Sequence, residues 1–127
     1  MNKTNGTLAK RHRREGADDT IIVGRSLDAQ NAKRFARSMT KLVESGTREC
    51  IIDMTSTEAV DSSGFGSLIA AVRRVGDIGG AVAIVCRDAT VRRLFEVAGI
   101  SRLVPVVPRM EDARIIMSAY ADAALAS

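Results

Sequence analysis

At the centre of the chain stands the heptapeptide Val60-Asp61-Ser62-Ser63-Gly64-Phe65-Gly66. It follows an apolar run, residues 50–54, that predicts a buried strand, and it precedes residues 67–75, whose apolar positions recur at helical spacing. The first turn of a helix leaves backbone N–H groups unpaired, so serines at such a junction suit anion chemistry, including a phosphate carried by a serine. Taken alone, the heptapeptide favours a plainer interpretation, in which its acidic and hydroxyl side chains cap the helix and its glycines form the turn.

Strand and helix patterns alternate on both sides of the heptapeptide. Short apolar and β-branched runs predict strands over residues 20–23, 49–54, 81–86 and 104–107. Helical spacing of apolar residues predicts helices over residues 28–46, 67–75 and 88–99, and a last helix after residue 108. This order predicts an α/β fold with a small, mostly parallel sheet. Pro105 places the last strand at a sheet edge.

The core must be aliphatic, because aromatic residues make up only 3% of the chain. In the helix over residues 88–99 we expect an inward stripe of Val91, Leu94, Phe95 and Ala98. In the last helix we expect the inward stripe to be Ile115, Ile116, Ala119 and Ala123.

The length of 127 residues and the 46% hydrophobic content suit one domain with a single core. We assign residues 20–127 to this domain. Residues 1–19 form a basic arm, partly disordered or carrying a short edge strand near residues 7–10. The net charge of +4 belongs to this arm, since residues 1–16 hold five basic residues against Glu15 alone. Such an arm can contact acidic protein, membrane or nucleic acid, or it can be a solvated tail.

Composition also argues against several function classes. Scarce aromatics and a neutral body argue against direct nucleic-acid binding. No phosphate-binding glycine loop or nucleophile elbow is present, and His12 lies in the basic arm, so we expect no enzyme, no catalytic residue and no cofactor. Cys50 and Cys86 lack metal-ligand spacing, so we expect no metal and two reduced, buried thiols. Without an apolar leader or a membrane span, we expect a cytoplasmic protein.

The heptapeptide, together with the strand before it and the Val91-Arg92-Arg93-Leu94-Phe95-Glu96-Val97-Ala98-Gly99-Ile100 segment, resembles the bacterial anti-sigma factor antagonists of the STAS domain family. The similarity runs in consistent order over roughly residues 20–120. It implies a small mixed sheet with helices packed mainly on one side.

The resemblance also implies a role for each residue of the turn. The serine directly after the aspartate, Ser62, would be phosphorylated by an anti-sigma factor that is also a serine kinase, and a serine phosphatase would reset the cycle. The unphosphorylated form would bind the anti-sigma factor and so release the sigma factor. The contact surface would comprise Asp61, Ser63, Gly64, Phe65 and Gly66, with Ser63 as the helix cap. Phe65 can be either an exposed anchor or a core residue.

One loop departs from the family pattern. The family commonly has a Gly-Glu-Leu-Asp sequence after the second strand, whereas this chain has Gly24-Arg25-Ser26-Leu27-Asp28. Since this loop would lie near Ser62, we expect Arg25 and Asp28 to alter partner contacts. The alternative function is a STAS module that does not switch and serves as a fixed subunit of a signalling scaffold or a transporter-associated complex. The sequence leaves the oligomeric state open.

Overall fold

The computed structural model describes the backbone of residues 10–13 and 19–126, and the side chains of residues 19–126. The elements are, in chain order, β1 (Lys10–Arg13), β2 (Asp19–Ile22), β3 (Ser26–Leu27), α1 (Ala32–Glu44), β4 (Glu49–Met54), β5 (Ala59–Val60), α2 (Ser62–Asp77), β6 (Ala81–Cys86), α3 (Ala89–Ala98), the short 3-10 helix η1 (Ile100–Arg102), β7 (Val106–Val107) and α4 (Met110–Ala126).

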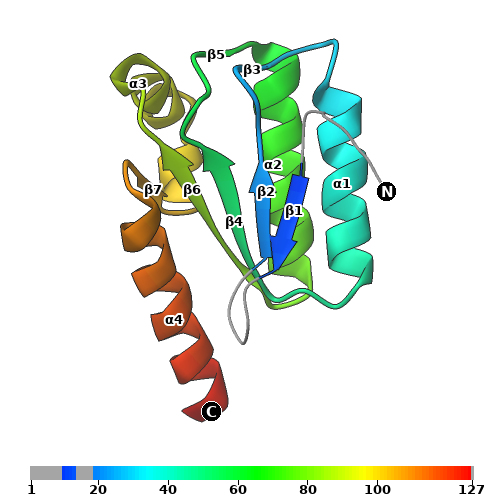
Figure 1. The fold of residues 1–127 in the computed structure, drawn as a ribbon, viewed down its shortest axis with the longest axis vertical. Helices are drawn as coiled ribbons and strands as arrows, with labels where there is room; N and C mark the ends of the chain where they lie inside the picture. The colour runs from blue at the N-terminus through cyan, green and yellow to red at the C-terminus, as the bar shows by residue number, and fades with distance from the viewer. Residues whose placement is uncertain (1–9, 14–18, 127) are drawn as a thin grey trace.

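In the described part of the chain, the main sheet has five strands in the order β1-β2-β4-β6-β7 (Figure 1). All pairs are parallel except β1 with β2, which confirms the mostly parallel α/β fold. β7 lies at one edge, as Pro105 predicted. β1 forms the other edge; the edge strand expected near residues 7–10 lies almost wholly outside the described residues.

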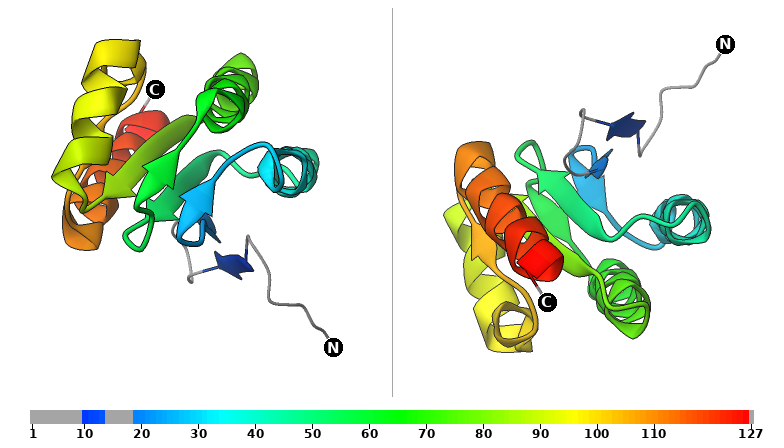
Figure 2. Two further views of the ribbon diagram at one scale, coloured as in Figure 1. Left: turned by 90° about the horizontal axis from the view of Figure 1, so that it is seen from above. Right: turned by 90° about the horizontal axis from the view of Figure 1, so that it is seen from below.

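Helices cover both faces of this sheet unequally (Figure 2). α1, α2 and α3 pack on one face, where the larger core is built around Phe35, Ile52, Leu68, Ile84 and Phe95. Of the described helices, only α4 covers the other face, where Ala113 and Met117 contact a smaller cluster from β4 and β6. β4 and β6 are therefore buried on both sides, which explains their continuous apolar sequences.

A second sheet of two short parallel strands, β3 and β5, was not predicted. Ser26 pairs with Ala59 and Leu27 with Val60, at the end of the molecule where α2 begins (Figure 1). Leu27 is fully buried and joins the larger core. The ribbon thereby fixes the chain immediately before the heptapeptide's polar residues.

The inward stripe expected for α4 was wrong in most positions. Ile115 is 67% exposed and Ala119 and Ala123 are also exposed, whereas Ala113 and Met117 are buried. The small Ala113 allows the helix to approach the sheet closely, and Met117 fills the space beside it. Of the expected residues only Ile116 packs against the core, on the flank of the helix.

Candidate functional site

The first turn of α2 is capped by Asp61. Its extended backbone (φ −100°, ψ −174°) is that of an N-cap residue, and its Oδ1 accepts a hydrogen bond from the backbone N–H of Gly64 at 2.9 Å. Its Oδ2 accepts a second bond, from the N–H of Ala29 at 3.2 Å. The prediction that Ser63 caps the helix was therefore wrong: the helix begins at Ser62, five residues earlier than expected, and Ser63 already lies within it.

Ser62 and Ser63 are the first two residues of α2, and both are exposed. Within the described residues neither hydroxyl is hydrogen bonded, and the backbone N–H groups of both serines are unpaired, as expected in a first helical turn. Each hydroxyl is thus accessible to a modifying enzyme. Unpaired N–H groups with the helix dipole favour a negative charge at this position.

Gly64 holds this turn against the β3–β5 ribbon. It is buried, and a Cβ placed on it would collide with the carbonyl group of Leu27 and lie 2.9 Å from Cγ1 of Val60. The N–H of Asp61 also donates to the carbonyl of Leu27, at 3.2 Å. Only glycine permits this approach, so the serines are presented by a turn fixed on both sides.

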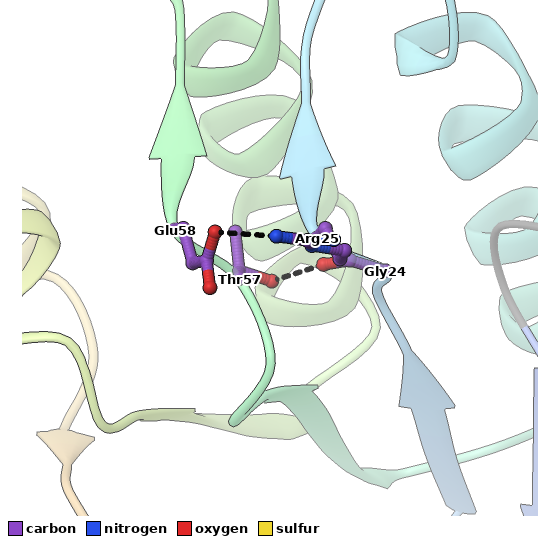
Figure 3. A network of polar contacts seen from close by, with 4 residues as sticks. All are labelled: Gly24, Arg25, Thr57 and Glu58. Atoms are coloured by element: carbon purple, nitrogen blue, oxygen red, sulfur yellow. Dashed lines mark hydrogen bonds and ion pairs between the residues drawn. The ribbon is translucent and has the colours of Figure 1, made fainter.

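The ribbon carries a polar network at its far end (Figure 3). Arg25 Nη2 lies 3.2 Å from Glu58 Oε1, and both side chains are largely exposed. Below them the hydroxyl of the buried Thr57 donates to the carbonyl of Gly24 at 2.7 Å. Arg25 therefore forms an ion pair with Glu58, which was not expected from the sequence.

Asp28 lies at the opposite end of the ribbon, next to the serines. Its Oδ1 accepts from the N–H of Gln30 at 3.0 Å, and its Oδ2 accepts from the hydroxyl of Ser26 at 3.2 Å. The carboxylate of Asp61 accepts a hydrogen bond from the N–H of Ala29, the residue after Asp28. The carboxylates of Asp28 and Asp61 therefore both lie near the start of α2. A phosphate on either serine would add to this negative charge.

Phe65 is half-buried, and its side chain packs against the larger core. Its ring packs edge-on against Phe95 of α3, with centroids 5.4 Å apart and planes at 84°. This contact couples the first turn of α2 to α3. Gly66, one residue later, is exposed and has open space where a Cβ would stand.

Two of the four residues expected in the inward stripe of α3 are exposed instead. They are Leu94, which is 40% exposed, and Ala98; Val97, which was not assigned to the stripe, is 75% exposed. These residues therefore lie on the part of α3 that points away from the core in which Phe95 is buried. The signal was present in the sequence, because Val91 and Phe95 alone satisfy an inward stripe with a spacing of four residues.

The site offers binding and modification chemistry. Among the described residues no group of three or more histidine, cysteine or acidic side chains could hold a metal ion. Asp53 and Asp61, a conceivable acidic pair, instead accept backbone hydrogen bonds, Asp53 from the N–H of Thr55 at 3.0 Å. No helix in the described part of the chain is long and apolar enough to cross a membrane.

The chain belongs to the STAS domain family: the family's sequence profile matches residues 14–113. Solved structures agree with this fold. An anti-sigma factor antagonist from Mycobacterium paratuberculosis is 21% identical, with a TM-score of 0.78 over 87% of this chain and 92% of that one. The Bacillus cell fate determinant SpoIIAA in its phosphorylated form is 17% identical, with a TM-score of 0.65 over 83% of this chain and 95% of that one.

One similar structure, that of SLC26A9, belongs to a much longer chain. SLC26A9 is 21% identical, with a TM-score of 0.69 over 84% of this chain but only 20% of the larger one. At these identities the likeness concerns the fold, which is shared by free-standing proteins and by a segment of a much longer one.

Proposed function

We propose that this protein is an anti-sigma factor antagonist that acts by exchanging partners. In its unphosphorylated form it binds an anti-sigma factor through the start of α2, the β3–β5 ribbon and the exposed side of α3. Phosphorylation of Ser62 by the kinase activity of that anti-sigma factor ends the interaction, and a serine phosphatase restores it. The protein acts by binding and performs no catalysis.

The observation that carries this proposal is the exposed, unbonded hydroxyl of Ser62 on a rigidly fixed turn. The side chain of Asp61 holds the turn by accepting a hydrogen bond from the N–H of Gly64, and Gly64 packs closely against the backbone of Leu27. Ser62 belongs to neither core cluster of the described residues, so a modification there leaves the core untouched. Support also comes from structural similarity to anti-sigma factor antagonists, including one whose structure is described as phosphorylated.

Electrostatics explains how a phosphate would end binding. It adds about −1.5 to −2 charge at pH 7, next to the carboxylates of Asp61 and Asp28. A partner that packs on this surface would have to desolvate that charge without a matched cation, at a cost of roughly 3 kcal/mol or more. This corresponds to at least about a hundredfold loss of affinity. The phosphate does not destabilise the free protein, because there it remains in water beside unpaired helix N–H groups.

The test is calorimetric titration of the co-encoded anti-sigma factor with three proteins. Wild type and Ser62→Asn, whose side chain matches aspartate in size but carries no charge, should bind with similar affinity. Ser62→Asp should bind at least about tenfold more weakly, as a single charge imitates a phosphate only in part. Equal binding by Ser62→Asp and wild type would count against the proposal. Far-UV circular dichroism of each variant checks that the fold is intact.

A second candidate function is a fixed STAS subunit of a signalling scaffold or a transporter-associated complex. The specific observation in its favour is the match to one segment of SLC26A9. This function predicts stable co-purification with other chains and no phosphate on Ser62 in cells. Intact-mass analysis of the protein purified from its native host distinguishes the two.

A further inference from the structure

The helical layer formed by α1 and α2 has a strongly basic outer surface. Of their charged residues six are cations and two are carboxylates, Glu44 and Asp77, which both lie in the last turn of their helices. The six cations are Lys33, Arg34, Arg37, Lys41, Arg73 and Arg74, and all are exposed. We call these six residues the basic face.

The cations of the basic face are not neutralised within the protein. Among the residues that the structure describes, none of the six forms an ion pair, and only Arg74 makes a side-chain hydrogen bond, to the hydroxyl of Thr40 at 3.0 Å. On the opposite side of the sheet, α4 carries three carboxylates against a single cation, Arg114. Figure 2 shows α1 and α2 side by side on one side of the sheet and α4 on the other. The outer surface of α1 and α2 therefore carries a net positive charge, and α4 on the other side of the sheet carries a net negative one.

We propose that the basic face binds the surface of an anionic lipid membrane. Each cation near such a surface contributes roughly fivefold to partitioning, and the acidic α4 on the far side orients the basic face toward the negative charge. The two helices lie in one layer, a shape that suits a flat surface. Bound in this way, the protein keeps the start of α2 at the rim of the contact, where Ser62 stays accessible.

The structure favours lipid over other anionic partners. A protein interface usually has an apolar centre, but none of the large exposed hydrophobic residues lies on α1, and α2 has one only at its C-cap, Ile78. Duplex DNA is read by an element that enters a groove, whereas α1 is sunk in the core through Phe35, Met39 and Leu42 and does not project. The same burial prevents insertion, so the contact is electrostatic and peripheral.

The test is cosedimentation of the full chain with vesicles. In ~0.1 M salt, where the screening length is about 10 Å, wild type should sediment with vesicles that contain about a third phosphatidylglycerol. It should not sediment with vesicles of pure phosphatidylcholine. Binding should disappear near 1 M salt, where the screening length is about 3 Å. Retention of binding at high salt, or sedimentation with neutral vesicles, would overturn an electrostatic contact.

Two pairs of variants locate the contact. The double variant Arg37→Glu with Lys41→Glu should lower partitioning onto the vesicles at least about tenfold. The control is Arg87→Glu with Arg102→Glu, which changes the net charge by the same amount at exposed positions outside the basic face. Its partitioning should stay within about twofold of wild type. Arg37→Gln with Lys41→Gln repeats the test with a smaller perturbation and a smaller expected loss. Equal losses in both reversal pairs would mean a response to net charge alone and would overturn the proposal. The proposal would also be overturned if wild type failed to sediment with the anionic vesicles but bound duplex DNA in a fluorescence polarisation assay.

Discussion

The carboxylate of Asp61 accepts the backbone N–H of Gly64 at 2.9 Å, and this bond fixes where α2 begins. The same side chain reaches the N–H of Ala29 at 3.2 Å, so one residue joins the helix start to the loop that precedes α1. Asp61 is therefore a structural residue, and its negative charge lies beside Ser62.

Replacing Asp61 should cost stability even without any partner. Asp61→Ala removes the cap and one loop hydrogen bond, so we expect the free energy of unfolding to fall by about 1–2 kcal/mol. Asp61→Ser keeps a capping oxygen and should lose less than half as much. Urea denaturation monitored by circular dichroism measures both, and equal losses for the two variants would contradict the capping role.

Two glycines of the same turn should respond in opposite directions. Gly64→Ala places a Cβ against the carbonyl of Leu27, and we expect a loss of at least about 2 kcal/mol, because backbone must move to admit it. Gly66→Ala meets no atom within 4 Å in an exposed helical position, and should stabilise the protein by about 0.5–1 kcal/mol. Thermal or urea unfolding of both variants gives the comparison; a neutral Gly64→Ala would contradict the close packing.

The aromatic contact between Phe65 and Phe95 should be measurable as a coupling energy. Edge-on pairs contribute about 0.5–1.5 kcal/mol beyond area burial. A double-mutant cycle with Phe65→Leu and Phe95→Leu keeps most of the apolar volume and should give a coupling in that range. Additivity within about 0.3 kcal/mol would mean that α2 and α3 are not joined through these rings.

Stability should decline in alkaline solution through Cys86. Burial raises the pKa of its thiol above the ordinary value of 9.0, and the hydrogen bond to the backbone of Asp88 offsets only part of this rise. The unfolded chain therefore loses the proton at lower pH than the folded one. Below about pH 9 the thiol is protonated in both the folded and the unfolded state, so its titration does not change stability. Above that pH the thiol ionises more readily in the unfolded chain, which lowers the free energy of unfolding.

The measurement is urea unfolding from pH 7 to 10 under reducing conditions, with Cys86→Ala as the control. Cys86→Ala will be less stable at every pH because it leaves a cavity, so the slopes above pH 9 are what matter. Wild type should lose stability more steeply than Cys86→Ala. Parallel curves would show that Cys86 has no part in the alkaline loss.

Regular elements with strong local patterns were predictable from the sequence. The strand at Glu49–Met54 has the expected bounds, and so does Ala81–Cys86. Asp88 caps α3 through the N–H of Val91, and Gly99 ends it at φ 82°, because both positions carry residues with a specific backbone preference. These signals are local, so one sequence sufficed.

Features that depend on tertiary packing were not predictable. β3 and β5 have two residues each, too few for periodicity, and their pairing across 33 residues exists only in the fold. α4 is rich in alanine on every side, so its inward face is decided by fit against the sheet. At the site, the two serines were identified from the sequence, but the N-cap of α2 was predicted to be Ser63 and is Asp61. The sequence could not distinguish them, because serine and aspartate both favour the N-cap position.

The central claim is that Ser62, and not Ser63, is the switch. The most direct measurement is incubation of the protein with the co-encoded anti-sigma factor and ATP, followed by intact-mass analysis and fragmentation of the peptide that spans the start of α2. The account predicts one added phosphate, located on Ser62, absent from Ser62→Ala and present in Ser63→Ala. A phosphate on Ser63, or no phosphate on either serine, would contradict it.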